Sequence, residues 1–427
     1  MADTIYALAT APGKAGLCVL RISGPRAFDI LTALGGGEVP LRSARVRALK
    51  DGAGGVLDQA LVLTFGAGRS FTGEDVVELH LHGSIAVQRA VFARLEELGL
   101  ARMAKPGEFT RRALLNGRMD LTEVQGLADV IEAETEEQRR AAMRVMGGEM
   151  SGLILGWRSR LIRAAALMEA TIDFADEEVP VDVMPEVVEL LSSVVDEMAG
   201  EASGSSAAKA LREGFEVAIV GAPNAGKSSL LNAIVRSDAA LVSEIPGTTR
   251  DVIERAVDLQ GLKVIFVDTA GLRETDDPVE RLGVARAKER AEAADMRLFL
   301  HEEESVPAFP VARAPHDLVC RTKADLHGGE GLSSRTGAGL DALLEAIAAH
   351  FASVAGSAGF VSRTQDEMAL REAIAALTSA LETCYLGDVE LVVFELRKAV
   401  TVLERIVGQI GVEDVLDEVF RSFCLGK

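Results

Sequence analysis

The fold class of this chain is decided by one stretch, Val217-Ala218-Ile219-Val220-Gly221-Ala222-Pro223-Asn224-Ala225-Gly226-Lys227-Ser228. An apolar, β-branched run leads into a glycine-bounded loop, and the loop opens into the helical run 230–234. This order of strand, loop and helix is the context that a phosphate-binding loop requires. Backbone N–H groups attract phosphate oxygens there, Lys227 reaches the terminal phosphates, and Ser228 offers a hydroxyl to Mg²⁺. An ordinary glycine turn is the alternative, but the spacing and the Lys-Ser ending favour a nucleotide triphosphatase.

Two further segments extend the predicted nucleotide site. The apolar run 263–267 predicts a buried strand, which ends in Asp268-Thr269-Ala270-Gly271. Ligands of doubly wound sheets gather at the carboxyl ends of the strands, so we expect Asp268 beside magnesium and the N–H of Gly271 at the γ-phosphate. The polar loop 246–251 precedes this strand, and its Thr249 hydroxyl would complete the magnesium shell unless the loop is an ordinary turn.

The segment Thr322-Lys323-Ala324-Asp325 favours guanine as the base. The Asp325 carboxylate accepts hydrogen bonds from the ring N–H and the exocyclic amine of guanine, a pair of donors that adenine lacks. GTPases usually carry asparagine where this chain has Thr322, and the shorter side chain leaves the nucleotide affinity open. The segment Ser333-Ser334-Arg335 lies where a backbone N–H usually meets the guanine oxygen.

The residues expected to catalyse hydrolysis differ from those of Ras-type GTPases. Leu272 stands where those proteins have the glutamine that orients the attacking water. The acidic stretch 274–280 supplies replacement candidates, and no arginine finger is obvious. The transition-state charge still requires a cation, and Asn224 in the phosphate loop is placed to help hold a monovalent one.

Motifs outside the GTPase segments are similar to those of the MnmE (TrmE) family of tRNA-modification GTPases. They lie at 3–10, 20–24, 71–80, 106–110 and 115–121, and the terminal Cys424-Leu425-Gly426-Lys427 is the most distinctive. The resemblance implies an enzyme that works with a partner, MnmG, and hydrolyses GTP with stimulation by potassium. Together they would place a carboxymethylaminomethyl or aminomethyl group on carbon 5 of the wobble uridine of certain tRNAs, using a tetrahydrofolate one-carbon unit.

The resemblance also implies roles for individual residues. Glu280 matches the acid that orients the attacking water, which answers the gap left by Leu272. The magnesium ligands correspond to Ser228 and Thr249, and the potassium ligands correspond to Asn224, Ser243, Ile245 and Thr248. The positions expected to bind GTP are Asn224, Ala225, Gly226, Lys227, Ser228, Ser229, Ser243, Glu244, Ile245, Pro246, Gly247, Thr248, Thr249, Asp268, Thr269, Ala270, Gly271, Thr322, Lys323 and Asp325.

Four positions match the folate ligands of the family, namely Arg21, Glu78, Arg118 and Lys427. A carboxylate suits the donor edge of a pterin, and Arg or Lys suits the carboxylates of its glutamate tail. Each would otherwise be an ordinary surface salt-bridge residue. The thiolate of Cys424 would activate carbon 5 of uridine by attacking carbon 6, although a single cysteine is more often a small buried hydrophobe.

Length and composition predict a soluble, cytoplasmic protein of two or three domains. The chain has 427 residues, and 48% are hydrophobic without a run that approaches a membrane span. The N-terminus has no signal region, and the four cysteines are scattered without zinc-site spacing. A formal charge of −20 argues against tight binding of tRNA by this chain alone, so the partner is expected to supply most phosphate contacts.

The patterns predict a multidomain chain with three kinds of module. Mixed strands and helices indicate an α+β domain over 1–118, to which the resemblance assigns folate binding and homodimerisation. Helical spacing indicates an all-α domain in two parts, 119–213 and 353–427, with the α/β P-loop GTPase domain inserted at 214–352. The serine-rich segment 203–206 predicts a loop just before the last helix of the first part.

Several weaker patterns have two readings. His80 and His82 alternate along a predicted strand and could share a metal, but no third ligand is evident. The acidic residues Asp173, Asp176 and Glu177 suggest either a cation site or a solvated helix end. For the whole chain, the alternatives are a ribosome-assembly or regulatory switch GTPase without a modification reaction, and a degenerate GTPase kept as a dimeric scaffold.

Overall fold

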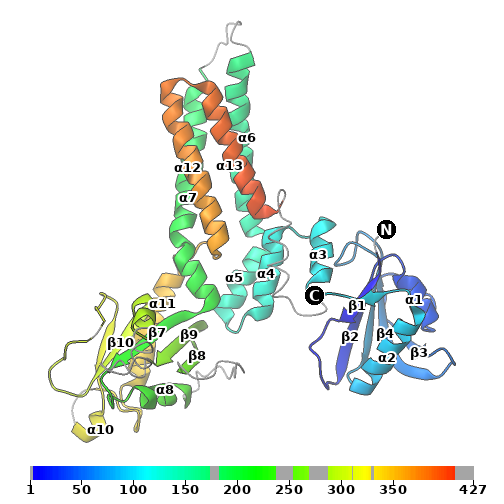
Figure 1. The fold of residues 1–427 in the computed structure, drawn as a ribbon, viewed down its shortest axis with the longest axis horizontal. Coiled ribbons are helices and arrows are strands. Elements are labelled where there is room, and N and C mark those ends of the chain that lie inside the picture. The colour runs from blue at the N-terminus through cyan, green and yellow to red at the C-terminus, as the bar shows by residue number, and fades with distance from the viewer. Residues whose placement is uncertain are drawn as a thin grey trace, which may run out of the picture. The chain divides into compact units, whose positions relative to one another are not determined.

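The computed structural model describes residues 3–173, 182–236, 253–268, 287–309, 311–327 and 331–408. The chain divides into two compact units, 1–128 with 404–427, and 129–403. The described parts of the first unit carry the predicted α+β domain, and those of the second carry helices and the GTPase module (Figure 1). Within the described residues, no helix combines the length and the apolar character needed to cross a membrane.

The N-terminal unit is built on a six-stranded sheet in the order β3-β4-β5-β2-β1-β6. Its neighbouring strands are antiparallel except for β1 and β6, which are parallel. The elements are β1 Ile5–Leu8, β2 Leu17–Ser23, α1 Ala27–Ala33, β3 Arg45–Lys50, β4 Val56–Phe65, β5 Val76–His82, α2 Ile85–Leu98, β6 Arg102–Met103 and α3 Glu108–Leu115.

Alternation along β2 and β5 gives this sheet two different faces. Leu20 and Ile22 of β2 and Leu79 of β5 are buried in one core with residues of α1 and α2. Since successive side chains of a strand point to opposite faces, Arg21 and Glu78 lie on the other face. The sheet therefore packs one apolar face on the helices, and its other face carries the polar Arg21–Glu78 pair beside a smaller apolar cluster of Ile5, Ala7, Ala104 and Phe109.

The second unit has helices before and after the GTPase module in the sequence, and these helices pack together as a bundle. In Figure 1, α7 and α12 run side by side, which agrees with the close contact between them. The helix before the module therefore pairs with the helix after it, as expected for an inserted domain. The helices from residue 121 on are α4 Leu121–Glu132, α5 Glu136–Met146, α6 Glu149–Asp173, α7 Met184–Glu213, α12 Thr364–Leu386 and α13 Val389–Val407.

The predicted loop at 203–206 is wrong, because α7 continues through it to Glu213. Small residues serve packing here instead of breaking the helix. A Cβ at Gly204 would lie 2.7 Å from the carbonyl oxygen of Ser357 and 2.8 Å from the nitrogen of Gly359. The linker that leaves the GTPase module thus packs directly on the backbone of α7, which explains the glycine.

The GTPase module contains a five-stranded sheet in the order β11-β10-β7-β9-β8, with β8 antiparallel at one edge and the other pairs parallel. Apolar cores lie on both faces of this sheet. The predicted fold class is confirmed. The elements are β7 Phe215–Gly221, α8 Lys227–Arg236, β8 Ile253–Leu259, β9 Leu262–Asp268, a helix over 287–293, β10 Met296–His301, β11 Leu318–Arg321, α10 Ala324–His327 and α11 Leu340–Ala355.

Candidate functional site: a phosphate loop and a polar sheet face

The predicted phosphate loop connects β7 to α8, and α8 begins at Lys227. Asn224 and Gly226 adopt positive φ angles of 65° and 93°, which turn the backbone sharply into the helix. The Lys227 ammonium donates to the carbonyl oxygens of Gly221 (2.9 Å) and Ala222 (3.1 Å), and the residue is 8% exposed. The lysine therefore lies folded over the loop that is expected to cradle phosphate.

Ser228 and Asp268, from α8 and the end of β9, meet at the centre of the site. The Ser228 hydroxyl donates to Oδ2 of Asp268 over 2.6 Å. Asp268 is 1% exposed, and its buried Oδ1 has no hydrogen-bond partner in the described part of the chain. A buried carboxylate oxygen without a partner is costly, and hydroxyl and carboxylate oxygens are the ligands that Mg²⁺ prefers. These residues fit a magnesium ion or one of its waters.

Thr322 links the base-binding segment to the phosphate loop. Its hydroxyl donates to the Ala225 carbonyl over 2.8 Å, with a longer contact of 3.3 Å to the carbonyl of His301. The residue is 4% exposed, so the bond is shielded from water. Thr322, although shorter than the asparagine usual at this position, therefore still braces the phosphate loop.

A cavity of about 470 Å³ lies beside these residues. Asp325 lines it, and the Ser333 hydroxyl donates to Asp325 Oδ1 over 2.8 Å, which orients the carboxylate. Lys323 also lines it, at a φ of 59°, with its ammonium 2.6 Å from Glu302 Oε2. The residues around the cavity are Gly226, Ser229, Asn232, Ala233, Arg236, Thr322, Lys323, Asp325, Leu326, Ser334 and Arg335.

Many predicted GTP-site residues lie outside the described residues, including the proposed catalytic acid Glu280. The others are Ser243, Glu244, Ile245, Pro246, Gly247, Thr248, Thr249, Thr269, Ala270 and Gly271. The C-terminal Cys424 and Lys427 lie outside them as well.

Arg21 and Glu78 are directly opposite each other on β2 and β5. Both Nε and Nη2 of Arg21 lie 2.9 Å from the same oxygen, Oε1 of Glu78, and each side chain is 18% exposed. The rings of Phe71 and Phe109 lie 5.1 Å and 5.7 Å from the guanidinium carbon, within cation–π range. Both rings belong to motifs that the sequence singled out, but their role against Arg21 became visible only in three dimensions.

The remaining polar candidates on this domain are placed as follows. Arg118 is exposed, and its Nη1 donates to the Gly68 carbonyl over 3.2 Å. His82 Nδ1 lies 2.7 Å from Asp58 Oδ1, and His80 Nε2 lies 3.8 Å from Glu78 Oε2. Over the described ranges, no group of three His, Cys, Asp or Glu side chains could hold a metal. The acidic side chains at 173–177 lie outside the described residues.

Comparison with known families accounts for both parts of the chain. Residues 4–118 match the family described as GTP-binding protein TrmE N-terminus, and residues 121–424 match the MnmE helical domain. The chain belongs to the MnmE family. It is therefore an enzyme, a GTPase of the tRNA-modification class, and the GTP-binding assignment of the phosphate loop agrees with this.

Full-length relatives support the MnmE assignment. The tRNA modification GTPase MnmE of Ruegeria sp. is 51% identical over 429 residues, and that of Cereibacter sphaeroides is 53% identical over 429 residues; each alignment covers 100% of both chains. Among solved structures, an Aquifex aeolicus Era variant bound to GDP·AlF4⁻ is 28% identical, with 31% of this chain and 56% of that chain covered and a TM-score of 0.26. That score is too low to support an inference.

Proposed function

We propose that this chain is a potassium-stimulated GTP hydrolase that acts with MnmG on the wobble uridine (position 34) of certain tRNAs. The product would carry a carboxymethylaminomethyl or aminomethyl group at carbon 5, with the one-carbon unit drawn from a 5-formyl- or 5,10-methylene-tetrahydrofolate. The observation that supports the hydrolase part is the Ser228–Asp268 contact with its unpartnered carboxylate oxygen beside the phosphate loop. We also propose domain boundaries at residues 118, 213 and 352.

The residues of the phosphate loop would act by position and charge. Lys227 would exchange its two carbonyl contacts for oxygens of the terminal phosphates. Ser228 with Asp268, joined by Thr249, would hold Mg²⁺, which supplies charge neutralisation at the phosphates when bound. Asp325, oriented by Ser333, would accept the two donors of guanine.

Hydrolysis further requires a cation and an oriented water. We assign potassium to Asn224, Ser243, Ile245 and Thr248, and the water to Glu280. Asn224 is exposed in the turn that leads into α8, which suits a ligand shared with a separate loop. Potassium would supply the positive charge that an arginine finger provides in other GTPases.

Folate binding is assigned to Arg21, Glu78, Arg118 and Lys427. Support comes from Glu78, because both contacts of Arg21 fall on Oε1 and His80 Nε2 lies 3.8 Å from Oε2. Oε2 is therefore able to accept from the amidine-like edge of a pterin, while Arg118 and Lys427 suit the glutamate tail. Cys424 is the candidate for attack on the uridine.

The proposed assembly is a homodimer that joins two FAD-containing MnmG subunits in a cytoplasmic heterotetramer. The net charge of −20 supports a division of labour in which tRNA phosphates are bound mainly through the complex. Strong, salt-sensitive tRNA binding by this chain alone in a filter assay would contradict that division.

The deciding measurement is GTP turnover in potassium against turnover in sodium. We expect a strong preference for potassium, and Glu280→Ala should lower kcat much more than it raises KM. Glu274→Ala, in the same acidic stretch, is the matched control. Equal rates in both ions would overturn the potassium assignment. A reconstituted assay with MnmG and tRNA separates this proposal from a switch GTPase, which would turn over GTP without modifying tRNA.

A further inference from the structure

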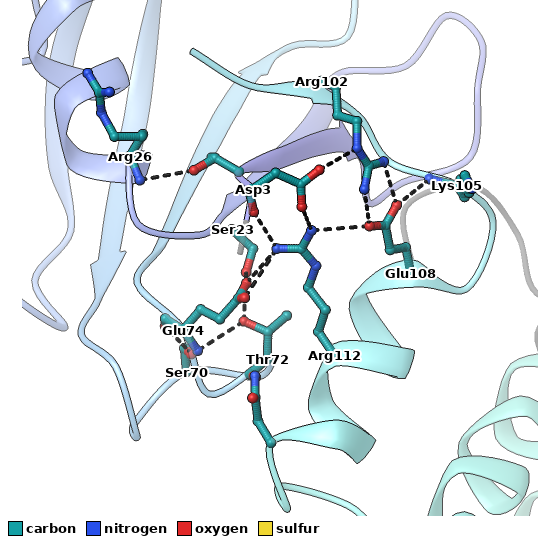
Figure 2. Close-up of polar contacts among 12 residues, drawn as sticks. Asp3, Ser23, Arg26, Ser70, Thr72, Glu74, Arg102, Lys105, Glu108 and Arg112 are labelled. Atoms are coloured by element: carbon teal, nitrogen blue, oxygen red, sulfur yellow. Dashed lines mark hydrogen bonds and ion pairs between the residues drawn. The ribbon is translucent and has the colours of Figure 1, made fainter. Parts of the chain in front are cut away.

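An ionic network centred on Arg112 of α3 joins three separate parts of the N-terminal domain (Figure 2). Nη1 of Arg112 donates to the Asp3 carbonyl at 2.7 Å and to both Glu74 carboxylate oxygens at 3.1 Å. Nη2 donates to Asp3 Oδ1 at 2.7 Å and to Glu108 Oε1 at 3.1 Å. The Arg112 side chain is only 11% exposed, so these contacts are largely shielded from solvent.

Glu74 extends the network into the loop 66–75. Its Oε2 accepts from the Ser23 hydroxyl at 2.6 Å, and Ser23 also contacts the Thr72 hydroxyl at 2.7 Å (Figure 2). The Ser70 hydroxyl donates to the Glu74 carbonyl at 2.5 Å. Ser23, Ser70 and Thr72 are buried, so the loop is fixed to the end of β2 and to α3 by bonds that water does not replace.

The elements held by this network carry the surroundings of the predicted folate residues. Loop 66–75 supplies Phe71, and α3 supplies the fully buried Phe109, the two rings that lie against Arg21. The same loop accepts from Arg118 at Gly68, and Asn116 Nδ2 donates to the Thr72 carbonyl at 2.7 Å. One loop and one short helix therefore set the position of Arg21 and one anchor of Arg118.

The pairing of Arg21 with a single oxygen of Glu78 has a consequence for ligand binding. Arg–carboxylate pairs are frequently bidentate, with one N–H on each oxygen. Here both N–H contacts reach Oε1, and the rings of Phe71 and Phe109 occupy positions against the guanidinium. A guanidinium released from the rings could rotate to cover Oε2, where it would compete with a ligand donor.

We propose that Arg112 is a positioning residue for the folate site: its network holds Phe71 and Phe109 so that Arg21 binds one oxygen of Glu78 and leaves the other for the pterin. This inference rests on the proposed folate function. It adds Arg112, Glu74 and Ser23 as positioning residues, and Phe71 and Phe109 as the contacts through which they act.

The test is the affinity of the full-length protein for 5-formyl-tetrahydrofolate, measured by equilibrium dialysis. Arg112→Met should weaken binding roughly 3- to 30-fold, as expected when an effect is transmitted through intervening side chains. Arg112→Lys has a single ammonium in place of the forked guanidinium, so its folate affinity should lie between those of the unmodified protein and Arg112→Met. Arg94→Met is the matched control, since Arg94 is similarly buried at 15% exposure and pairs with Glu97 on α2. Circular dichroism and a thermal melt check the folding of each variant, and GTP turnover is expected to be unchanged.

Two further variants distinguish positioning from a purely structural role. Ser23→Ala removes only the hydroxyl that joins Thr72 to Glu74 and should weaken folate binding in the same direction, which decides the question if Arg112→Met does not fold. Arg112→Met combined with Phe71→Leu should lose no more affinity than the worse single variant, because both act on Arg21. Additive losses, or binding equal to that of Arg94→Met, would overturn the inference.

Failure of the inference and failure of the folate function are separable. If the unmodified protein binds no 5-formyl-tetrahydrofolate, the proposed folate function is wrong. If it binds, and Glu78→Gln weakens binding about 100-fold while Arg112→Met and Ser23→Ala do not change it, the folate site stands and the positioning role is wrong.

Discussion

The phosphate loop and the polar face of the N-terminal sheet are both candidate binding sites, but they are built in different ways. The loop draws Asn224, Lys227 and Ser228 from one continuous stretch, and much of its binding capacity resides in the backbone. The sheet face draws Arg21, Phe71, Glu78 and Phe109 from separated motifs. A local site tolerates change elsewhere, whereas a distributed site depends on the elements that hold its parts.

The largest expected effect is at the phosphate loop. Lys227→Ala removes the cation that meets the developing charge, and we expect GTP hydrolysis to fall by about 1000-fold. Folate affinity should not change, because the two sites do not share residues. Measuring kcat/KM for GTP together with the Kd for 5-formyl-tetrahydrofolate on one preparation checks both halves. A parallel loss of folate affinity would show that the sites are not independent.

A comparable substitution at the sheet face should lower folate affinity and leave GTP turnover unchanged. Glu78→Gln keeps the shape but removes the charge that accepts the pterin donors, so folate affinity should fall about 100-fold. Basal GTP turnover should stay at the level of the unmodified protein. His82→Gln, at an exposed position on the same strand, serves as the control. Equal effects of the two substitutions would remove Glu78 from the site.

Stability should respond to pH through a carboxyl in the helical bundle. Burial raises the pKa of Asp366 from 3.8 to about 6, against the opposing effect of Arg363. The folded state then keeps a proton that the unfolded chain loses, so stability falls as pH rises from about 4 to 6 and is level above that. Asp366→Asn should flatten this slope and recover up to about 3 kcal/mol at neutral pH.

Thermal midpoints measured between pH 4 and 7 test this expectation. Asp196→Asn, at an exposed position on α7, is the control and should follow the unmodified protein. The network around Arg112 should contribute only at the acid end of this window, below about pH 4.5, and with the opposite slope. Burial raises the pKa of Glu108, but the Arg102 hydrogen bond and its other partners lower it to about 2 overall, so that contribution is lost only as the pH falls from about 4.5 towards 2. A slope that persists in Asp366→Asn would assign the dependence to other groups.

The smallest expected effect concerns the brace from Thr322. Thr322→Val removes one buried hydrogen bond to the Ala225 carbonyl, and GTP affinity should weaken about tenfold. Thr378→Val is the matched control, because that exposed hydroxyl also donates to a backbone carbonyl, on α12. Nucleotide titration by fluorescence measures both. An unchanged affinity in Thr322→Val would mean that the loop holds its shape without the brace.

The order of residues along the chain was sufficient to predict the phosphate loop and the strand and helix on either side of it. The run Val217–Val220 and the loop after it became β7 and the start of α8, because strand, turn and helix signals there are contiguous. The loop predicted at 203–206 was wrong because tertiary packing outweighed the local composition there. Its serines and glycine indicate a loop by composition, but packing of the linker at Ser357 and Gly359 keeps Gly204 inside a helix.

The sequence by itself determined the family, the fold class and the phosphate loop, because each depends on residues that are close together or on motifs read one at a time. Only the tertiary structure decided that Thr322 reaches Ala225, that Phe71 and Phe109 lie against Arg21, and that Arg112 joins Asp3 to Glu74. These pairs are far apart along the chain. Their contact follows from how strands and helices pack, which residue spacing does not encode.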